Sequence, residues 1–314
     1  MFTEPADIDR SEVLDALRTH WSIETTAIEH APVGFGSHHY VVDERWFLTL
    51  DDLDEHAWFD DAFYGLVGAF ETIHTLRSSG LEFVLAPVRG IDGQLLRRVC
   101  GHYSLTVFPF ERGRSSAYGD HASDADRREV LAALGRLHAT SAPASARRDP
   151  LTVLKRDGLD AALEDLDATW DAGPFGEPTR ELLVEYASSV RERLAAFDQL
   201  AASLSRDDWV VTHGEPHAAN VLRTDDRRFL LIDWDTVAVG PRERDLWMVE
   251  PRDADDWAAY GTGSSVDPEA IRLYRLWWDL TEIALYATQF RRPHVEDADT
   301  RTAFDGFREY LTSD

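Results

Sequence analysis

A carboxylate, a carboxamide and two further carboxylates lie close together in the sequence, each after an apolar run. Glu215 and Asn220 follow the run VVT, and Asp233 and Asp235 follow the run FLLI. Apolar runs of this length indicate buried strands, so these polar side chains belong at the ends of neighbouring strands. Magnesium binds oxygen ligands, and phosphoryl transfer needs a carboxylate that orients the acceptor hydroxyl. The pattern therefore predicts a magnesium-dependent phosphoryl-transfer site.

The same loop offers a zinc-site alternative, which its sequence argues against. His213 and His217 have the i, i+4 spacing of two zinc ligands on one helix. However, Gly214 and Pro216 lie between them, and a proline inside a helix costs about 3 kcal/mol. We therefore interpret this stretch as a loop without zinc.

The elements that must position these residues fall into two regions. The first is strand-rich, with a helix at 55–79 that ends before Gly80, and with expected strands at 22–31, 38–50, 82–88, 94–99 and 103–108. The second contains the strand-loop-strand at 209–235 and expected helices at 124–139, 155–170, 179–204, 242–250, 267–289 and 299–311. The segment PFERGRSS separates the regions, which predicts one lobe at 1–112 and another at 113–314.

The composition excludes several classes of protein. The 314 residues carry 58 Asp and Glu against 32 Lys and Arg, a formal charge of −26. A chain this acidic is repelled by nucleic acid and by anionic membranes, so neither is expected as a partner. The sequence contains no apolar run long enough to span a membrane, and its single Cys100 excludes an internal disulfide. We expect a cytoplasmic protein, a monomer or a homodimer.

Four segments of the chain resemble the aminoglycoside phosphotransferase family of small-molecule kinases. The catalytic loop is HGEPHAAN at 213–220, and the metal segment is IDWD at 232–235. GPRERDL at 240–246 is similar to a structural segment of the family, and LGRLH at 134–138 to a helix that ends in Leu-His. The resemblance covers about residues 25–250. It implies an α+β, two-lobed protein-kinase-like fold with a small antiparallel-sheet N-lobe and a larger helical C-lobe.

The resemblance also implies roles for the residues of these segments. Glu215 stands where the family has its proton-accepting Asp, and Asn220 and Asp233 would hold magnesium. Asp235 would add a water-mediated contact to the metal. His213 would structure the loop, and Asp245 would bind its backbone. In a chain with 58 acidic residues, the alternative for each carboxylate is a solvated surface charge.

On the N-lobe, the resemblance assigns a nucleotide site to two segments. The turn Gly34-Phe35-Gly36-Ser37-His38 would cover the phosphates; a plain hairpin turn is the alternative. Phe108 and Phe110 would lie at the hinge near the base, and core packing is their alternative. The resemblance thus implies ATP or GTP, with Mg²⁺, as cofactors.

Two positions depart from the family pattern. Glu215 carries one methylene more than the family's Asp, which matters because small misplacements of a catalytic group lower the rate. The family also has a strand lysine that binds the nucleotide phosphates, and here alternation places Thr49 at that position. The only lysine, Lys155, lies outside the small lobe. The partner glutamate would be Glu71, which has no obvious cation; His38, His39 and Arg45 are the nearest candidates.

Several acids and tryptophans of the second lobe are candidates for binding an acceptor. Trp277 and Trp278 would form an aromatic wall, with helix-core packing as the alternative, and the acidic candidates are Glu250, Asp253, Asp255, Asp256, Asp279 and Glu282. We expect transfer of a γ-phosphoryl group to a small-molecule hydroxyl, with cationic antibiotics among the acceptors. Two alternatives remain: a degenerate kinase that binds without transfer, and a metabolic kinase for a choline-like, homoserine-like or sugar substrate.

Overall fold

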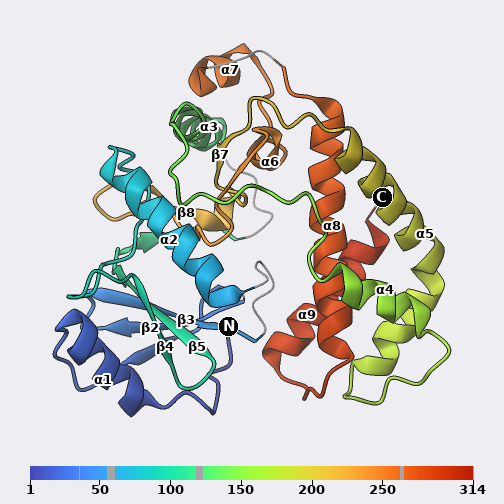
Figure 1. Ribbon diagram of the computed structural model, residues 1–314, viewed down its shortest axis with the longest axis horizontal. Helices are drawn as coiled ribbons and strands as arrows, with labels where there is room; N and C mark the ends of the chain where they lie inside the picture. The colour runs from blue at the N-terminus through green and yellow to red at the C-terminus, as the bar shows by residue number, and fades with distance from the viewer. Residues whose placement is uncertain (35, 55–60, 118–122, 262–264, 314) are drawn as a thin grey trace. The chain divides into compact units, whose positions relative to one another are not determined.

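The structure is a computed structural model that describes residues 1–34, 36–54, 61–117, 123–261 and 265–313. The chain folds as two compact units (Figure 1). The first unit joins Met1–Asp149 to Arg206–Val266, and the second joins Pro150–Ser205 to Asp267–Asp314. The expected lobe boundary at residue 112 falls inside the first unit and stays a prediction.

Within the described part of the first unit, five strands form an antiparallel sheet in the order β1-β2-β3-β5-β4. The strands are β1 (Glu29–Ala31), β2 (His38–Val42), β3 (Trp46–Asp52), β4 (Leu96–Val99) and β5 (Tyr103–Pro109). Asp43 and Glu44 form the turn between β2 and β3, with φ of 52° and 51°. The sheet confirms the antiparallel N-terminal region expected from the sequence.

Alternation gives the two faces of this sheet different characters. Leu48 and Leu50 of β3 are fully buried and pack with Val13 and Leu17 of α1 (Arg10–Trp21). Burying a leucine side chain contributes roughly 1.5–3 kcal/mol, so this face anchors the sheet. The opposite face carries Thr49, and on it Phe108 contacts Phe70 of α2 (Ala62–Ser78). The two helices thus lie on opposite faces (Figure 1).

Sequence signals place the ends of these helices. The Asp9 side chain accepts hydrogen bonds from the backbone N–H groups of Ser11 and Glu12, which caps α1. Asp61 caps α2 in the same way, and Gly80 follows that helix with a φ of +97°. The expected helix start at residue 55 falls on residues 55–60, which lie outside the described residues.

The rest of the first unit holds the catalytic segments. Two small sheets, β10-β7 and β6-β8-β9, lie beside short helices. Their elements are β6 (Gly113–Arg114), α3 (Asp124–His138), β7 (Val210–Thr212), η1 (Ala218–Asn220), β8 (Val221–Thr224), β9 (Phe229–Leu231), β10 (Ala238–Gly240), α6 (Glu243–Leu246) and α7 (Ala254–Tyr260). This confirms the strand-loop-strand expected at 209–235.

Two expectations for this unit are wrong, and one helix was not expected. Residues 82–88 do not form a strand; Val84 makes only an isolated bridge to Leu231, because pairing stops where β9 ends. The helix expected at 242–250 is limited to α6. Helix α7 was not expected, because seven residues are too few to show helical periodicity.

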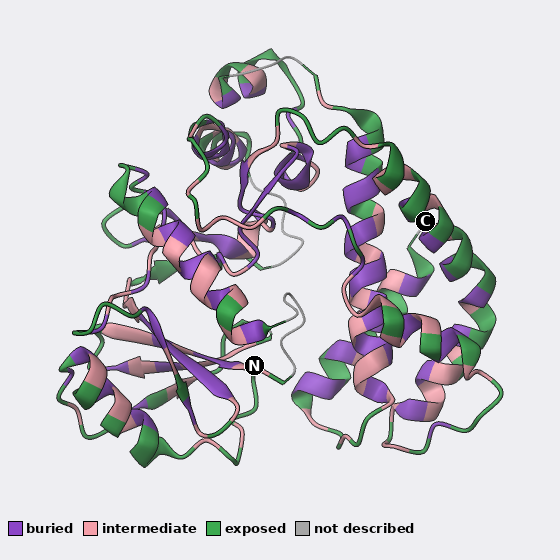
Figure 2. Ribbon diagram, viewed as in Figure 1, coloured by how far each residue is buried: buried purple, intermediate pink, exposed green. Residues whose placement is uncertain are grey.

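The second unit is helical in all its described secondary structure. Its helices are α4 (Arg156–Glu164), α5 (Gly176–Ser203), α8 (Pro268–Phe290) and α9 (Ala298–Thr312). Asp267 caps α8, and Pro268 occupies its first turn. Figure 2 shows α8 buried along most of its length. The helix expected at 155–170 ends at Glu164. Over the described ranges, none of the helices is long and apolar enough to cross a membrane.

Candidate active site

One buried carboxylate holds the backbone of the loop between β7 and β8. Asp245 of α6 is fully buried. Its Oδ2 accepts a hydrogen bond of 2.9 Å from the His213 backbone N–H, and its Oδ1 accepts one of 2.7 Å from that of Gly214. Burial raises the pKa of Asp245, but the hydrogen bond from His138 outweighs it with other nearby charges and leaves this pKa lowered. Asp245 therefore stays ionised and fixes the start of the loop.

Gly214 allows the loop to approach this support closely. Its φ is +106°, a region that favours glycine. A Cβ atom at Gly214 would collide with Thr236 Oγ1 and with the guanidinium of Arg244. The glycine of the HGE segment is thus required both by the backbone conformation and by the space available.

His213 joins the loop to the metal segment. Its Nδ1 accepts a 3.1 Å hydrogen bond from the Glu215 backbone N–H, and its Nε2 donates one of 3.0 Å to the Ile232 carbonyl. Its ring also packs on Trp234, with the ring centroids 4.2 Å apart. Burial lowers the pKa of His213 to about 4, so the ring stays neutral and can accept as well as donate. These contacts are those of a loop-structuring residue.

Asn220 closes the loop. Its Nδ2 donates to the Glu215 carbonyl at 3.0 Å and also lies 3.4 Å from His217 Nε2. The amide nitrogen is therefore directed back into the loop, and the amide oxygen points away from these two partners. The Glu215 side chain is 14% exposed, with Oε2 3.8 Å from His217 Nε2. The Ile232 N–H donates to the Asn220 carbonyl at 3.0 Å, so the loop and the metal segment are directly joined.

The two aspartates of the metal segment repel each other and their neighbours. Asp233 has a φ of 63°, which an aspartate adopts at a cost. Desolvation by the surrounding protein and the charge of the Glu215 carboxylate raise the pKa of Asp233. Desolvation and the Asp233 charge raise the pKa of the half-buried Asp235.

This donor set fits magnesium. Two carboxylates whose mutual repulsion a cation would relieve, and the amide oxygen of Asn220, are ligands that a hard divalent cation prefers. Within the described residues, no three His, Cys, Asp or Glu side chains converge on a metal position. A metal-binding role for Asn220, Asp233 and Asp235 stays a prediction.

A buried arginine that the sequence analysis did not single out supports this arrangement. The guanidinium of Arg244 donates to Thr212 Oγ1 and to the Thr236 carbonyl, both at 2.8 Å, and lies 3.0 Å from Asp149 Oδ2. Thr236 Oγ1 in turn donates to the His213 carbonyl at 3.0 Å. Arg244 lies in the RERDL segment, and Thr236 directly follows the IDWD segment. The sequence gives no sign that the Arg244 side chain points inward.

The glycine turn lies at the edge of the small sheet. Gly34 and Gly36 have φ of 71° and 99°, and residue 35 lies outside the described residues. Ser37 Oγ donates a 2.7 Å hydrogen bond to the buried Asp51. His38 pairs with Leu50, so it lies on the face that packs on α1, against Tyr103, and not on the Thr49 face. The phosphate-binding roles of these turn residues stay predictions.

The other candidate residues of the small lobe are Phe108, Phe110 and Glu71. Phe108 is half-buried against Phe70, and the Phe110 N–H donates to the Arg45 carbonyl at 2.9 Å. Glu71 does have a cation, contrary to expectation: Arg89 binds it through two hydrogen bonds of 2.6 and 2.8 Å. The sequence analysis missed Arg89 because it lies in a loop well beyond α2.

Most of the acidic acceptor candidates already have arginine partners. Asp279 binds Arg193 at 2.9 Å, and the charges of Asp253, Asp255 and Asp256 meet Arg128. Trp278 is buried, and its Nε1 donates to Tyr310 Oη at 3.2 Å, as expected of a core residue. Trp277 is buried likewise. Glu250 is exposed and Glu282 half-buried. An acceptor-binding role for Glu250, Asp279, Glu282 and Trp278 stays a prediction.

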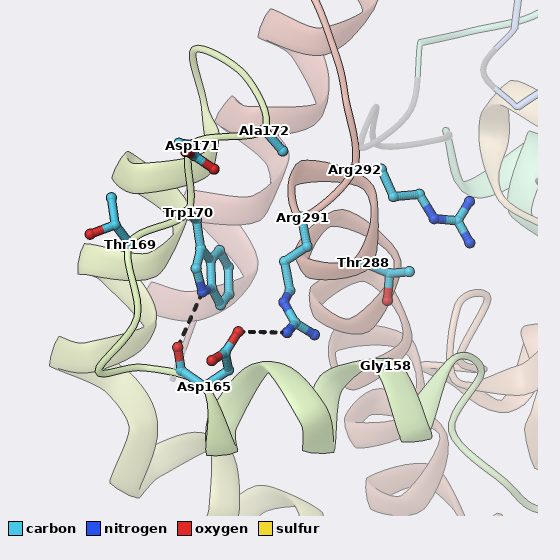
Figure 3. Close-up of a pocket in the computed structure, with 9 residues that line it drawn as sticks. All are labelled: Gly158, Asp165, Thr169, Trp170, Asp171, Ala172, Thr288, Arg291 and Arg292. Atoms are coloured by element: carbon cyan, nitrogen blue, oxygen red, sulfur yellow. Dashed lines mark hydrogen bonds and ion pairs between the residues drawn. The ribbon is translucent and has the colours of Figure 1, made fainter.

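The helical unit also contains a pocket of about 340 Å³ (Figure 3). Trp170 and Arg291 lie on its wall, with the guanidinium 5.2 Å from the ring centroid. Arg291 also binds Asp165 at 2.8 Å. The charges that line this side of the pocket are thus paired with each other.

Comparisons with known proteins agree with this geometry. The family model described as "Phosphotransferase enzyme family" matches residues 40–286. Protein StrN of Streptomyces griseus is 30% identical over an alignment of 305 residues, which covers 92% of this chain and 87% of that protein.

Solved structures show the same fold. A spectinomycin phosphotransferase in complex with ADP and spectinomycin has a TM-score of 0.74 at 17% identity, covering 96% of this chain and 94% of that one. An amicoumacin kinase in complex with AMP-PNP and Ca²⁺ has a TM-score of 0.61 at 15% identity, covering 98% and 94%. The expected protein-kinase-like fold and family resemblance are confirmed: the chain belongs to the phosphotransferase enzyme family and is a small-molecule phosphotransferase.

Proposed function

We propose that this protein transfers the γ-phosphoryl group of ATP or GTP to a hydroxyl group of a small molecule. The observation that carries this proposal is the junction of the two catalytic segments. The side-chain nitrogen of Asn220 donates to the Glu215 backbone carbonyl, and the backbone carbonyl of Asn220 accepts from the Ile232 N–H. Ile232 directly precedes Asp233. The proposed proton acceptor and the three proposed oxygen ligands would thus share one hydrogen-bonded support.

In this proposal each side chain has one task. Asn220 and Asp233 hold magnesium, and Asp235 adds a contact through water. When bound, the ion neutralises charge on the transferring phosphate. Three side chains keep the geometry of the loop. Asp245 and His213 accept hydrogen bonds from its backbone, and Arg244 donates to Thr212, directly before it.

Glu215 orients the acceptor hydroxyl and takes its proton. The acceptor oxygen forms a bond to the γ-phosphorus while the bond from that phosphorus to the bridging oxygen breaks, and the nucleoside diphosphate leaves with the bonding electrons. The hydroxyl proton moves to Glu215. Its backbone is held through both the N–H and the carbonyl, so the carboxylate starts from a fixed position.

Antibiotics are the first acceptor class to test. Two of the similar structures are a spectinomycin phosphotransferase and an amicoumacin kinase. The charge of −26 attracts cationic acceptors, and Glu250, Asp279, Glu282 and Trp278 are the proposed contacts in this protein. A cytoplasmic location would give it access to ATP and GTP.

A phosphorylation screen read by mass tests the proposal. The purified protein is offered aminoglycosides, spectinomycin-like compounds, nucleoside antibiotics, choline, homoserine and sugars, each with ATP and with GTP. We expect a mass increase of one phosphoryl group for at least one compound, and its loss in Asp233→Ala. Failure of every compound with both nucleotides would argue against transfer.

One observation favours a second candidate, nucleotide binding without transfer. The sheet face that should carry the phosphate-binding lysine carries Thr49 and the buried Asp51. A carboxylate there repels phosphate oxygens, and no strand lysine holds them in place. A nucleotide bound through magnesium would then lack the contact that positions its γ-phosphate for transfer. Magnesium-dependent nucleotide binding, measured calorimetrically, with no product in the screen would identify this case.

A further inference from the structure

His138, the last residue of α3, bonds to both sides of a buried network. Its Nε2 lies 2.9 Å from Asp245 Oδ2, and its Nδ1 lies 2.7 Å from Tyr260 Oη. The side chain is 3% exposed, and the Asp245 side chain is inaccessible to solvent. Tyr260 is the last residue of α7, which no sequence motif connects to the catalytic loop. A tyrosine far along the chain is thus three hydrogen bonds away from the loop backbone.

The hydrogen bonds determine which nitrogen of His138 carries the proton. An ionised carboxylate only accepts, so Nε2 must donate to Asp245. In a neutral ring Nδ1 then has a lone pair, which the Tyr260 hydroxyl satisfies as a donor. The hydroxyl holds the other side of the ring, in the orientation in which Nε2 points at the carboxylate. Tyr260 therefore fixes the His138 ring against Asp245.

Asp245 connects the His138 ring to the catalytic loop. Its Oδ2 accepts from both His138 and the His213 N–H, and its Oδ1 accepts from the Gly214 N–H. A carboxylate that loses one of three buried donors is held less firmly in place. The next residue after Gly214 is Glu215, so a displaced Asp245 displaces the proposed proton acceptor.

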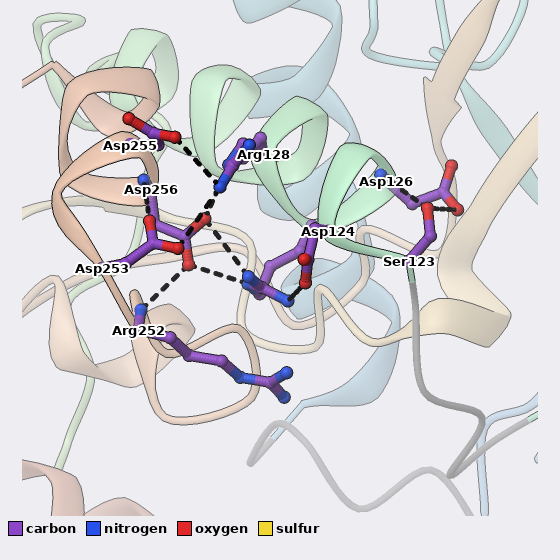
Figure 4. A network of polar contacts seen from close by, with 9 residues as sticks. Ser123, Asp124, Asp126, Arg128, Arg252, Asp253, Asp255 and Asp256 are labelled. Carbon is purple, nitrogen blue, oxygen red and sulfur yellow. Dashed lines mark hydrogen bonds and ion pairs between the residues drawn. The ribbon is translucent and has the colours of Figure 1, made fainter.

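Helix α7 is firmly joined to α3, so Tyr260 itself is fixed. At one end, Asp256 accepts from Arg127 Nε at 2.8 Å and from Arg128 Nε at 3.1 Å, and from the Arg252 N–H at 2.9 Å (Figure 4). At the other end, Gly135 faces the Tyr260 carbonyl so closely that no Cβ atom would fit. The helix is short, but both of its ends are tied to α3.

We propose that Tyr260 is a positioning residue, which fixes the catalytic loop through His138 and Asp245, and that α7 serves to hold it there. The inference rests on the proposed function, because it assigns Tyr260 a part in the same reaction. Its structural content, the chain Tyr260–His138–Asp245–Gly214, does not depend on which acceptor is used.

The test is Tyr260→Phe in the full chain, compared with Tyr40→Phe. Tyr40 is a matched control, because its hydroxyl also bonds one side chain, Glu4 at 3.2 Å, on the sheet face that packs on α1. In Tyr260→Phe we expect kcat to fall about 10-fold with KM for nucleotide and acceptor within about 2-fold, as for a lost positioning contact. Tyr40→Phe should leave both constants unchanged.

Two readouts are independent of turnover. Nitrogen NMR of labelled histidines should show His138 protonated at Nε2 in the original protein, and a shifted Nδ1 signal in Tyr260→Phe, where Nδ1 loses the tyrosine hydroxyl. Hydrogen exchange of the Gly214 amide should become about 10-fold faster in that variant. Unchanged exchange of the Gly214 amide would overturn the inference. A protein that never transfers phosphate but shows both changes would refute the proposed function alone.

A second variant protects the test against misfolding. His138→Gln keeps a donor toward Asp245 and removes the need for Tyr260. If the inference is right, adding Tyr260→Phe to His138→Gln changes neither Gly214 exchange nor kcat further. An additional loss equal to that of Tyr260→Phe alone would show that the two residues act independently, and would overturn it.

Discussion

Glu215 extends one methylene further from the backbone than the aspartate that the family has at this position, while the loop around it is fixed. Its N–H binds His213 and its carbonyl binds Asn220. The loop therefore holds a given backbone position, and the side-chain length decides where the carboxylate lies. We infer that the acceptor site is shaped for the longer side chain.

Two substitutions of Glu215 should distinguish the effect of its charge on kcat from the effect of its side-chain length. Glu215→Gln removes the proton acceptor, and kcat should fall by about 10²–10⁴-fold. Glu215→Asp keeps the carboxylate but withdraws it by roughly one bond length, and kcat should fall by about 10–100-fold. Steady-state kinetics on the best acceptor measures both. An aspartate variant faster than the original protein would contradict the idea of a site shaped for glutamate.

Gly214 offers a test of the backbone geometry itself. Gly214→Ala should destabilise the protein by about 3 kcal/mol, because a Cβ at φ +106° also collides with Thr236 and Arg244. Gly101 is a matched control: its φ is +80°, but nothing lies within 4 Å of a Cβ there. Gly101→Ala should cost only about 1 kcal/mol. Thermal unfolding distinguishes the two, and equal losses would argue against the tight approach of the loop.

At the scale of elements, the sequence predicted what strong local signals encode. Apolar runs predicted the strand-loop-strand at 209–235, and a capping glycine predicted the end of the helix before Gly80. The motifs predicted that the segments of Asn220 and Asp233 lie side by side. Helix α7 was not predicted, because seven residues are too few to show a helical repeat of apolar side chains. The contacts that hold it come from arginines of α3. Arg89 and Tyr260 were missed for the same physical reason: their partners are distant in the chain.

The joint between α3 and α7 should depend on pH. Asp256 is closed to solvent, although it lies near the surface of its unit. Desolvation raises the pKa of Asp256, but the Arg127 hydrogen bond and its other partners together lower it to about 2. A lowered pKa in the folded state stabilises the fold at pH values above about 4, the usual pKa of aspartate, and this contribution disappears as the pH falls from 4 to 2.

Asp256→Asn should therefore destabilise the protein by about 1–2 kcal/mol at neutral pH, through loss of the charge that Arg127 and Arg128 bind. The difference from the original protein should shrink below pH 4. Urea unfolding at pH 7 and at pH 3 measures it. A difference that is constant with pH would show that the charge of Asp256 does not stabilise the joint.

At the scale of the whole molecule, the composition restricts the mechanism. The protein carries a charge of −26 and has one lysine, Lys155. Lys155 precedes α4 and belongs to the helical unit, whereas the small sheet has Thr49 at the expected lysine position. If the protein transfers phosphate, it binds the phosphates without a strand lysine. Either another cation of the small lobe contacts them, or, as we propose, magnesium and backbone amides hold them.

Lys155→Gln tests this directly, because it removes the positive charge. Because the proposed machinery does not use Lys155, the variant should keep kcat and the nucleotide KM within about 2-fold of the original values. The same should hold after chemical acetylation of that single lysine. A loss of nucleotide binding in either case would mean that Lys155 reaches the phosphates.

The central claim is that Asp233 holds the ion on which phosphoryl transfer depends. The most direct measurement is the rate of transfer from γ-labelled nucleotide, with magnesium varied, in the original protein, in Asp233→Asn and in Asp225→Asn. Asp225 is exposed in the turn between β8 and β9, so it undergoes the same chemical change outside the site. We predict that Asp233→Asn abolishes magnesium-dependent transfer and that Asp225→Asn retains it. Equal transfer in both variants would contradict the account.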